Sequence, residues 1–272
     1  MTEELIGNRI RVVNLRWLVI LAVGLLLFGW LLNTPPGLLG KADAIGYAVC
    51  HRIDLRSFHL GDRVVPLCAR CTGMYLGALL ALGFQYLTGP RRSGPPSVGT
   101  MIVLAAFVVA FAIDGLNSFL SLIPNAPHLY EPINGLRLIT GTGMGLVIAA
   151  ALYPGFNQAV WADADPHPAL SGWKKLIILI ACALILDMLV FSENPFVLYP
   201  LALLSAAGVM VILTMVYCML WIIMMRSENR YRSIRQLWFP LIGGFGLALL
   251  QIALLDYARF LFTGTWDGFH LG

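Results

Sequence analysis

The run Phe196–Met225, FVLYPLALLSAAGVMVILTMVYCMLWIIMM, contains no charged residue. A helix needs about 20 apolar residues to cross roughly 30 Å of hydrocarbon, because every backbone N–H and C=O must be bonded within the segment. This run exceeds that length and predicts a membrane-spanning helix. Of the 272 residues, 59% are hydrophobic and 12% are charged, whereas a soluble domain usually carries about 25% charged residues. The chain is therefore expected to be an integral membrane protein.

Similar apolar runs precede and follow this one. They cover about 15–33, 66–87, 100–123, 134–153, 174–192 and 237–260. With 196–225 they predict an all-α, polytopic transmembrane helical bundle of about seven spans, and six to eight fit the pattern. We expect a single integral membrane domain over residues 1–272, with the motif-bearing helices at 66–153. No cleavable signal peptide is expected, since 14–33 is long enough to span.

The positive charges indicate an orientation. The net charge is +4, but the 18 Lys and Arg residues are scattered over the ends of the spans without a basic stripe, so no nucleic-acid partner is expected. Positively charged loops are retained in the cytoplasm. A cytoplasmic N-terminus places eleven of these residues inside and seven outside. Five of the seven fall within 41–70, so the predicted external segment 34–65 and the residues just after it carry unexplained charge.

That region contains the chemically distinctive sequence CHRIDLRSFHLGDRVVPLCARCTGMY at 50–75, with three of the five cysteines. Pro66 suits the first turn of a helix, so Cys68 and Cys71 are expected in that turn, on one face. Two such thiols could bind one zinc ion, with Cys50 and His51 as further ligands in a tetrahedral set. His59 is an alternative imidazole ligand.

Two other hypotheses remain open for these cysteines. A helix N-terminus and Arg70 would stabilise a thiolate at Cys68, so the CxxC pair could perform thiol–disulfide exchange, with Cys50 as resolving thiol and quinone as electron acceptor. An external location also permits a structural disulfide between Cys50 and one of the pair. Zinc is the preferred cofactor, and quinone belongs to the redox alternative.

Polar residues within the predicted spans cluster toward the same side of the membrane. Asp114 and Asn117 fall in the outer half of 100–123, and Asn134 and Arg137 share a face at the start of 134–153. Glu131 directly precedes them. A charge near the bilayer centre costs at least about 2.5–3.5 kcal/mol on insertion scales, so such residues face a bundle interior or wet cavity and usually pair. We expect Asp114 to pair with Arg137.

These residues suggest a substrate site. Asp114, Asn134 and Arg137 are the candidate catalytic residues. Guanidinium groups suit phosphate oxygens, so an anionic lipid headgroup or a small polar substrate is expected, although the external arginines could instead pair with Asp43, Asp54 and Asp62. The candidate substrate-binding residues are Arg52, Arg56, Arg70, Tyr75, Asn117 and Glu131.

The order of these motifs resembles a known family. Cys-His, Arg-Ser-Phe and Pro-Leu-Cys-Ala-Arg-Cys-Thr-Gly-Met-Tyr, followed by Asp114, Asn134 and Arg137, are similar to the prokaryotic membrane-protein family known as domain of unknown function 2085, over about 45–150. The resemblance implies a multi-pass protein of the plasma (inner) membrane. It implies no reaction. A zinc-organised site, a quinone-coupled thiol oxidoreductase and a non-catalytic subunit that packs on other membrane subunits therefore remain alternatives.

Overall fold

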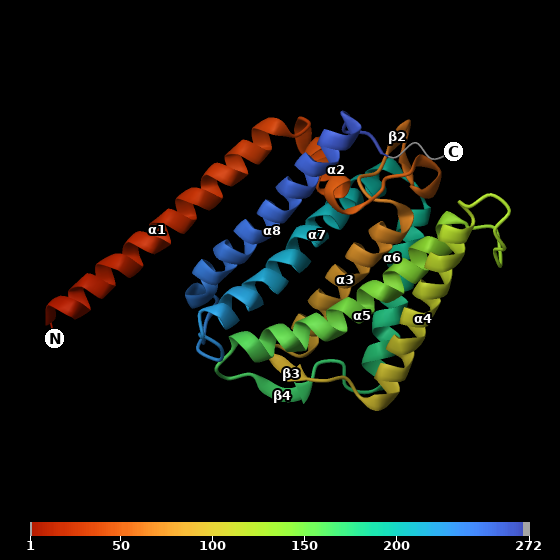
Figure 1. Cartoon of the computed structure of the whole chain (residues 1–272). Helices are drawn as coiled ribbons and strands as arrows, with labels where there is room; N and C mark the ends of the chain where they lie inside the picture. Colours follow the sequence, from red (N-terminus) through yellow and green to blue (C-terminus); the bar gives the residue numbers. More distant parts are fainter. Residues whose placement is uncertain (1, 269–272) are drawn as a thin grey trace.

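The computed structural model describes residues 2–268 and the side chains of residues 16–268, and each of the seven predicted runs is a helix in it (Figure 1). The prediction of an all-α bundle is confirmed. The seven long helices are α1 (Thr2–Asn33), α3 (Ala69–Thr88), α4 (Val98–Leu120), α5 (Asn134–Val160), α6 (Trp173–Phe191), α7 (Pro195–Met224) and α8 (Ile234–Thr263).

Five of these helices are long and apolar enough to cross a membrane, counted over the described residues: 16–33 of α1, and α4, α5, α7 and α8. The other two, α3 and α6, have 20 and 19 residues. Two lysines and Asp187 lower the apolar character of α6, and Arg70 and Gln85 lower that of α3. The predicted count of about seven is therefore roughly compatible with the structure.

The segment before α3 is more structured than expected. Residues 34–65 contain the helix α2 (Gly37–Val49), a 3-10 turn at Asp54–Arg56, and a hairpin of β1 (His59–Leu60) and β2 (Arg63–Val64). The 13 residues of α2 are too few to cross a bilayer. It lies at the end of the bundle opposite β3 (Arg92–Gly94) and β4 (Asp165–Pro168), which pair in parallel (Figure 1).

Helices α3 and α5 form the closest contact in the bundle. A Cβ added at Gly141 of α5 would lie 2.1 Å from the carbonyl oxygen of Arg70, and one at Gly145 would lie 2.2 Å from that of Met74. Gly73 of α3 meets α5 in the same way, at 2.3 Å from the carbonyl oxygen of Leu138. Small residues let membrane helices approach backbone to backbone, so these glycines fix the position of Arg70 against α5.

Helix α1 lies at the edge of the bundle and packs mainly against α8 (Figure 1). In its described side chains, only Trp30 is buried among residues 16–33, whereas Leu18, Leu25 and Phe28 are each about 60% exposed. The outer faces of α4 and α6 also expose large apolar residues. These faces are suited to lipid, which satisfies apolar side chains without further protein packing.

Candidate metal and anion site

The first turn of α3 presents two cysteines to the end of α2. Helix α3 begins at Ala69, with Cys68 as its N-cap and Cys71 in the first turn. The prediction that Pro66 lies in the first turn was wrong, because the helix begins three residues after it. Cys50 is the C-cap of α2. A Cβ at Gly46 would lie 1.9 Å from the carbonyl oxygen of Pro66, so the missing side chain there permits the approach that brings Cys50 to Cys68.

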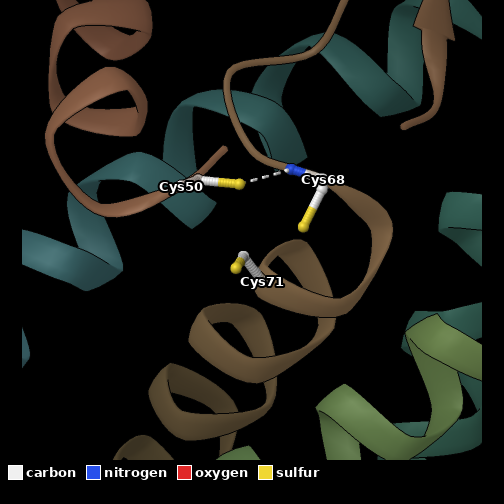
Figure 2. A group of neighbouring side chains, drawn as sticks. All are labelled: Cys50, Cys68 and Cys71. Carbon is white, nitrogen blue, oxygen red and sulfur yellow. Dashed lines mark hydrogen bonds between the residues drawn. The ribbon is translucent and has the colours of Figure 1, made fainter. Parts of the chain in front are cut away.

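The three sulfur atoms converge on one point (Figure 2). The Sγ atoms of Cys50, Cys68 and Cys71 all lie within 4.8 Å of one another, and none of the three cysteines is in a disulfide. The backbone N–H of Cys68 donates to Cys50 Sγ at 3.3 Å. Tetrahedral zinc with bonds of about 2.3 Å separates its sulfur ligands by about 3.8 Å, so small side-chain adjustments would suffice for coordination.

The fourth position has one nearby imidazole. His51 Nδ1 lies 3.5 Å from Cys50 Sγ, although it stands outside the group of three converging ligand atoms. His59, the alternative imidazole, instead contacts Asp54 at 2.9 Å through Nε2. A side-chain hydrogen bond with Cys68, followed by one with Cys71, lowers the pKa of the Cys50 thiol well below its ordinary value, against the opposing effect of burial. A thiolate is the form that binds metal or attacks a disulfide.

Arg259 of α8 holds the loop that carries Cys50 and His51. Its Nη1 donates to the carbonyl oxygens of Tyr47 and Cys50, both at 2.6 Å, and its Nη2 donates to that of His51 at 3.3 Å. Its guanidinium also lies 4.0 Å from the Tyr47 ring centroid. A cation at the C-terminal end of a helix satisfies carbonyl groups that lack intrahelical partners. The last helix therefore fixes the backbone around Cys50.

The structure pairs Asp114 with Arg70. The prediction that Asp114 pairs with Arg137 was therefore wrong. Arg70 forms an ion pair with Asp114 through Nη2, and its Nε donates to Asp114 Oδ2 at 3.1 Å. Tyr130 OH donates to Asp114 Oδ1 at 2.9 Å, and Thr140 Oγ1 donates to Oδ2 at 3.2 Å. Arg137 instead donates to Asn134 Oδ1 at 2.9 Å and to Ser118 Oγ at 3.3 Å.

Three arginines surround one serine of α4. Arg56 Nη2 donates to the carbonyl oxygen of Ser118 at 2.9 Å, Arg70 Nη2 donates to Ser118 Oγ at 3.0 Å, and Arg137 Nε donates to the same Oγ at 3.3 Å. We call Arg56, Arg70 and Arg137 the arginine cluster. Arg70 and Cys68 belong to the same turn, so the cluster and the cysteines lie at one end of the bundle.

The arginine cluster carries more positive than negative charge. Its three guanidinium groups share the single carboxylate of Asp114. Burial and the neighbouring Arg70 lower the pKa of Arg56 from its ordinary value. Among the described residues, Arg137 Nη2 has no hydrogen-bond partner, and it is not sealed from solvent. Such N–H groups can donate hydrogen bonds to an anion. A bound anion would also reduce the repulsion between the three guanidinium groups.

Of the other predicted residues, Asn134 and Asn117 contact the arginine cluster and the loop next to it, and three others contact different parts of the molecule. Asn134 belongs to the cluster, because its Nδ2 donates to the carbonyl oxygen of Ser57 at 3.2 Å and its Oδ1 accepts from Arg137 Nη1 at 2.9 Å. Asn117 shapes the next loop by accepting from the N–H of Leu129 at 2.6 Å and donating to the carbonyl oxygen of Tyr130 at 2.8 Å.

Three predicted substrate-binding residues point elsewhere. Glu131 contacts His128, and its side chain is 87% exposed. Arg52 pairs with Asp43 at 2.9 Å, and Asp43 also pairs with Arg63, so the alternative of local pairing is correct for these two arginines. Tyr75 packs among apolar side chains beside Cys71.

Sequence reasoning missed Ser118, Tyr130 and Arg259. Ser118 lies four residues after Asp114 and so shares its helical face, which is a signal that could have placed it. Arg259 lies three residues after Asp256 at the end of the last span, another recognisable pattern. Tyr130 lies in the loop between α4 and α5, where no periodicity indicates its direction.

Comparisons with known proteins agree with the resemblance inferred from the sequence. Residues 50–151 match the family described as "Predicted membrane protein (DUF2085)". An uncharacterized protein of Methanothermobacter thermautotrophicus is 29% identical over 101 residues, which are 37% of this chain and 81% of that protein. One of Methanocaldococcus jannaschii is 25% identical over 118 residues, 43% of this chain and 70% of the relative. No solved structure gives a significant match. The match spans the cysteine cluster and the arginine cluster.

Proposed function

We propose that this membrane protein binds a phosphate-bearing anion, an anionic lipid headgroup or a small polar phosphate, at the arginine cluster. We further propose that a zinc ion held by Cys50, Cys68 and Cys71 orders the segment that supplies Arg56 and Arg70. The observation that carries the proposal is the convergence of three guanidinium groups on Ser118 against one carboxylate.

Charge and geometry both favour an anion of the phosphate class. Planar guanidinium forks match phosphate oxygens, and several of them can donate to one group at the same time. Arg137 is buried and Arg70 is mostly buried, so the cluster is partly screened from water. An anion there would interact more strongly than at an open surface. Asn134 would orient Arg137 toward it, and Asp114 would orient Arg70.

The cysteine cluster is proposed as the element that keeps this region ordered. Arg56 lies between Cys50 and Cys68 in the chain, and Arg70 lies between Cys68 and Cys71. A zinc ion bonded to three thiolates, with His51 or water as fourth ligand, would tie the end of α2 to the start of α3. Two of the five positive charges in 41–70, Arg56 and Arg70, then belong to the site. The proposal retains an N-terminus in the cytoplasm and the cysteines on the outer face of the plasma membrane.

Binding of phosphate-bearing probes tests the anion site. Purified full-length protein in detergent is titrated with inorganic phosphate, with phosphatidic acid and with phosphatidylcholine. Arg56→Gln is informative, since among the described residues the Arg56 side chain makes one hydrogen bond with α4, to a backbone carbonyl. We expect it to weaken binding about 10- to 100-fold, the value of a charge-assisted hydrogen bond. The exposed Arg230, replaced by Gln, is the matched control. Equal affinities of the two variants would refute the anion site.

Metal content tests the zinc proposal. Elemental analysis of the purified protein should give one zinc per chain, because one tetrahedral site is proposed. Cys68→Ser combined with Cys71→Ser should remove it. Cys182→Ser is the control, since Cys182 lies alone in α6. Clean preparations without zinc would end this part of the proposal.

The close approach of the three Sγ atoms, all within 4.8 Å of one another, favours a second candidate, a thiol–disulfide oxidoreductase. The thiols of Cys68 and Cys71 would form a disulfide and give two electrons and two protons to a membrane quinone, which would become quinol. Alkylation of membranes treated with reductant or with quinone distinguishes this candidate. Thiols that remain equally reactive under both treatments would contradict it.

A further inference from the structure

A second feature of the molecule lies between α1 and α8, beside the apolar cluster that also contains the cysteines. A cavity of about 670 Å³ separates α1 from α8. Its walls are mostly apolar and include Leu25, Gly29 and Trp30 of α1, and Asp256, Tyr257 and Phe260 of α8. The volume is within the range of about 300–1,000 Å³ that is typical of small-molecule sites.

Asp256 gives this apolar cavity its one strong acceptor of hydrogen bonds. The residue is only 3% exposed, and its Oδ2 accepts from Trp30 Nε1 at 3.0 Å. Within the part of the chain that the structure describes, Oδ1 has no hydrogen-bond partner. A buried oxygen of this kind is unfavourable unless a donor reaches it. The neighbouring cation, Arg259, donates to the backbone carbonyls of Tyr47 and Cys50.

The cavity faces the apolar flank of the bundle. Leu25 and Tyr257, which line it, are 63% and 64% exposed. Figure 1 shows α1 and α8 side by side along the edge of the bundle, near the end that carries α2. A ligand with a long apolar chain could therefore enter from the lipid, with its polar head at the level of Asp256.

We propose that the cavity between α1 and α8 binds an amphiphile with a single aliphatic chain whose head group donates a hydrogen bond to Asp256 Oδ1. Hydroxyl and ammonium heads share this chemistry. The apolar lining would take the chain, and a small rotation of the Asp256 carboxyl group would bring Oδ1, which is sealed from solvent in the structure, to the ligand head. This inference does not depend on zinc or on the anion site, because none of its lining residues belongs to either.

A photolabelling experiment tests the proposal on the full-length protein. Three probes carry the same octadecyl chain with a diazirine at mid-chain: the alcohol, the amine and the methyl ether, which has no donor. Peptide mapping should place the alcohol or amine label within 25–34 and 253–260, with at least about 10-fold less label from the ether, the value of one hydrogen bond to a charged group. Preference between alcohol and amine identifies the head.

Two glycines of α1 provide a matched pair of variants. A Cβ added at Gly29 or at Gly24 meets no heavy atom within 4 Å, but only Gly29 lines the cavity. Gly29→Leu should fill the cavity and remove the label, whereas Gly24→Leu should keep it, and both variants should elute as the wild type does. Asp256→Leu should reduce alcohol labelling to the level of the ether. Equal labelling by ether and alcohol, or full labelling of Gly29→Leu, would overturn the proposal.

Discussion

Asp114 and Asp256 are both buried in long apolar helices, yet their surroundings differ. Asp114 has an ion pair with Arg70 and accepts hydrogen bonds from Tyr130 and Thr140. Asp256 has one donor, Trp30, and one oxygen without a partner among the described residues. The helix packing around the two residues also differs. On the Asp114 side α3 and α5 meet backbone to backbone, whereas on the Asp256 side α1 packs mainly on α8. A buried acid is thus fully paired on one flank and keeps an unpartnered oxygen on the other.

The comparison predicts its largest effect at Asp114. Asp114→Asn would leave the three arginines without a carboxylate, and breaking a buried ion pair costs on the order of 3–5 kcal/mol. Asp256→Asn should change the free energy of unfolding by no more than about 1 kcal/mol, because the amide oxygen can still accept from Trp30. Denaturant unfolding in detergent measures both. Similar losses in the two variants would remove the distinction between the flanks.

Arg259 connects the two flanks, and its removal should have the next largest effect. Arg259→Gln loses charge-assisted hydrogen bonds to the carbonyl groups around Cys50, a cost on the order of 3 kcal/mol. We expect faster alkylation of Cys50 and a lower zinc content. Arg230→Gln at the opposite end is the control. Unchanged alkylation of Cys50 would show that the carbonyl contacts do not order the cysteine cluster.

Glycine substitutions test the difference in helix packing. Gly141→Ala places a Cβ 2.1 Å from a backbone oxygen of α3, so it should destabilise the protein by about 1–3 kcal/mol. Gly246→Ala places a Cβ 2.4 Å from the side chain of Val23 in α1, which can move aside. Its cost should stay below about 1 kcal/mol. The opposite order in thermal unfolding would mean that α1 is held as rigidly as α3.

The smallest effect concerns the loop that presents Tyr130 to Asp114. The hydrogen bond that His128 donates to Glu131 raises the pKa of His128 above its ordinary value. The protonated pair should therefore stabilise the loop at pH below about 6.5 and lose this effect as the pH rises through the raised pKa. Hydrogen exchange of the loop amides in the wild type and in His128→Gln measures it. A profile with the same pH dependence in the variant would exclude His128 as its cause.

The sequence predicts the helices of this protein well, because long apolar runs have few alternatives in a membrane. It also places Cys50, Cys68 and Cys71 in one region, since Pro66 and the CxxC spacing define the start of a helix. The helix α2 was missed because its 13 residues fall below spanning length.

Partner choice within the site was harder to predict. The ion pair of Asp114 with Arg70 depends on how closely α3 approaches α5, which is set by the glycines of both helices acting together. Periodicity gives the face on which a residue lies but not the distance between two helices. The roles of Tyr130 and Arg259 depend in the same way on contacts between segments far apart in the chain.

The central claim is that the cysteines and the arginine cluster form one site at one end of the bundle. The most direct test is the affinity for phosphatidic acid or inorganic phosphate, whichever binds more tightly, before and after zinc is removed with a chelator. Our account predicts at least a 10-fold loss of affinity, equivalent to about 1.4 kcal/mol, and recovery when zinc is restored. An affinity that does not change when the metal is removed would contradict it.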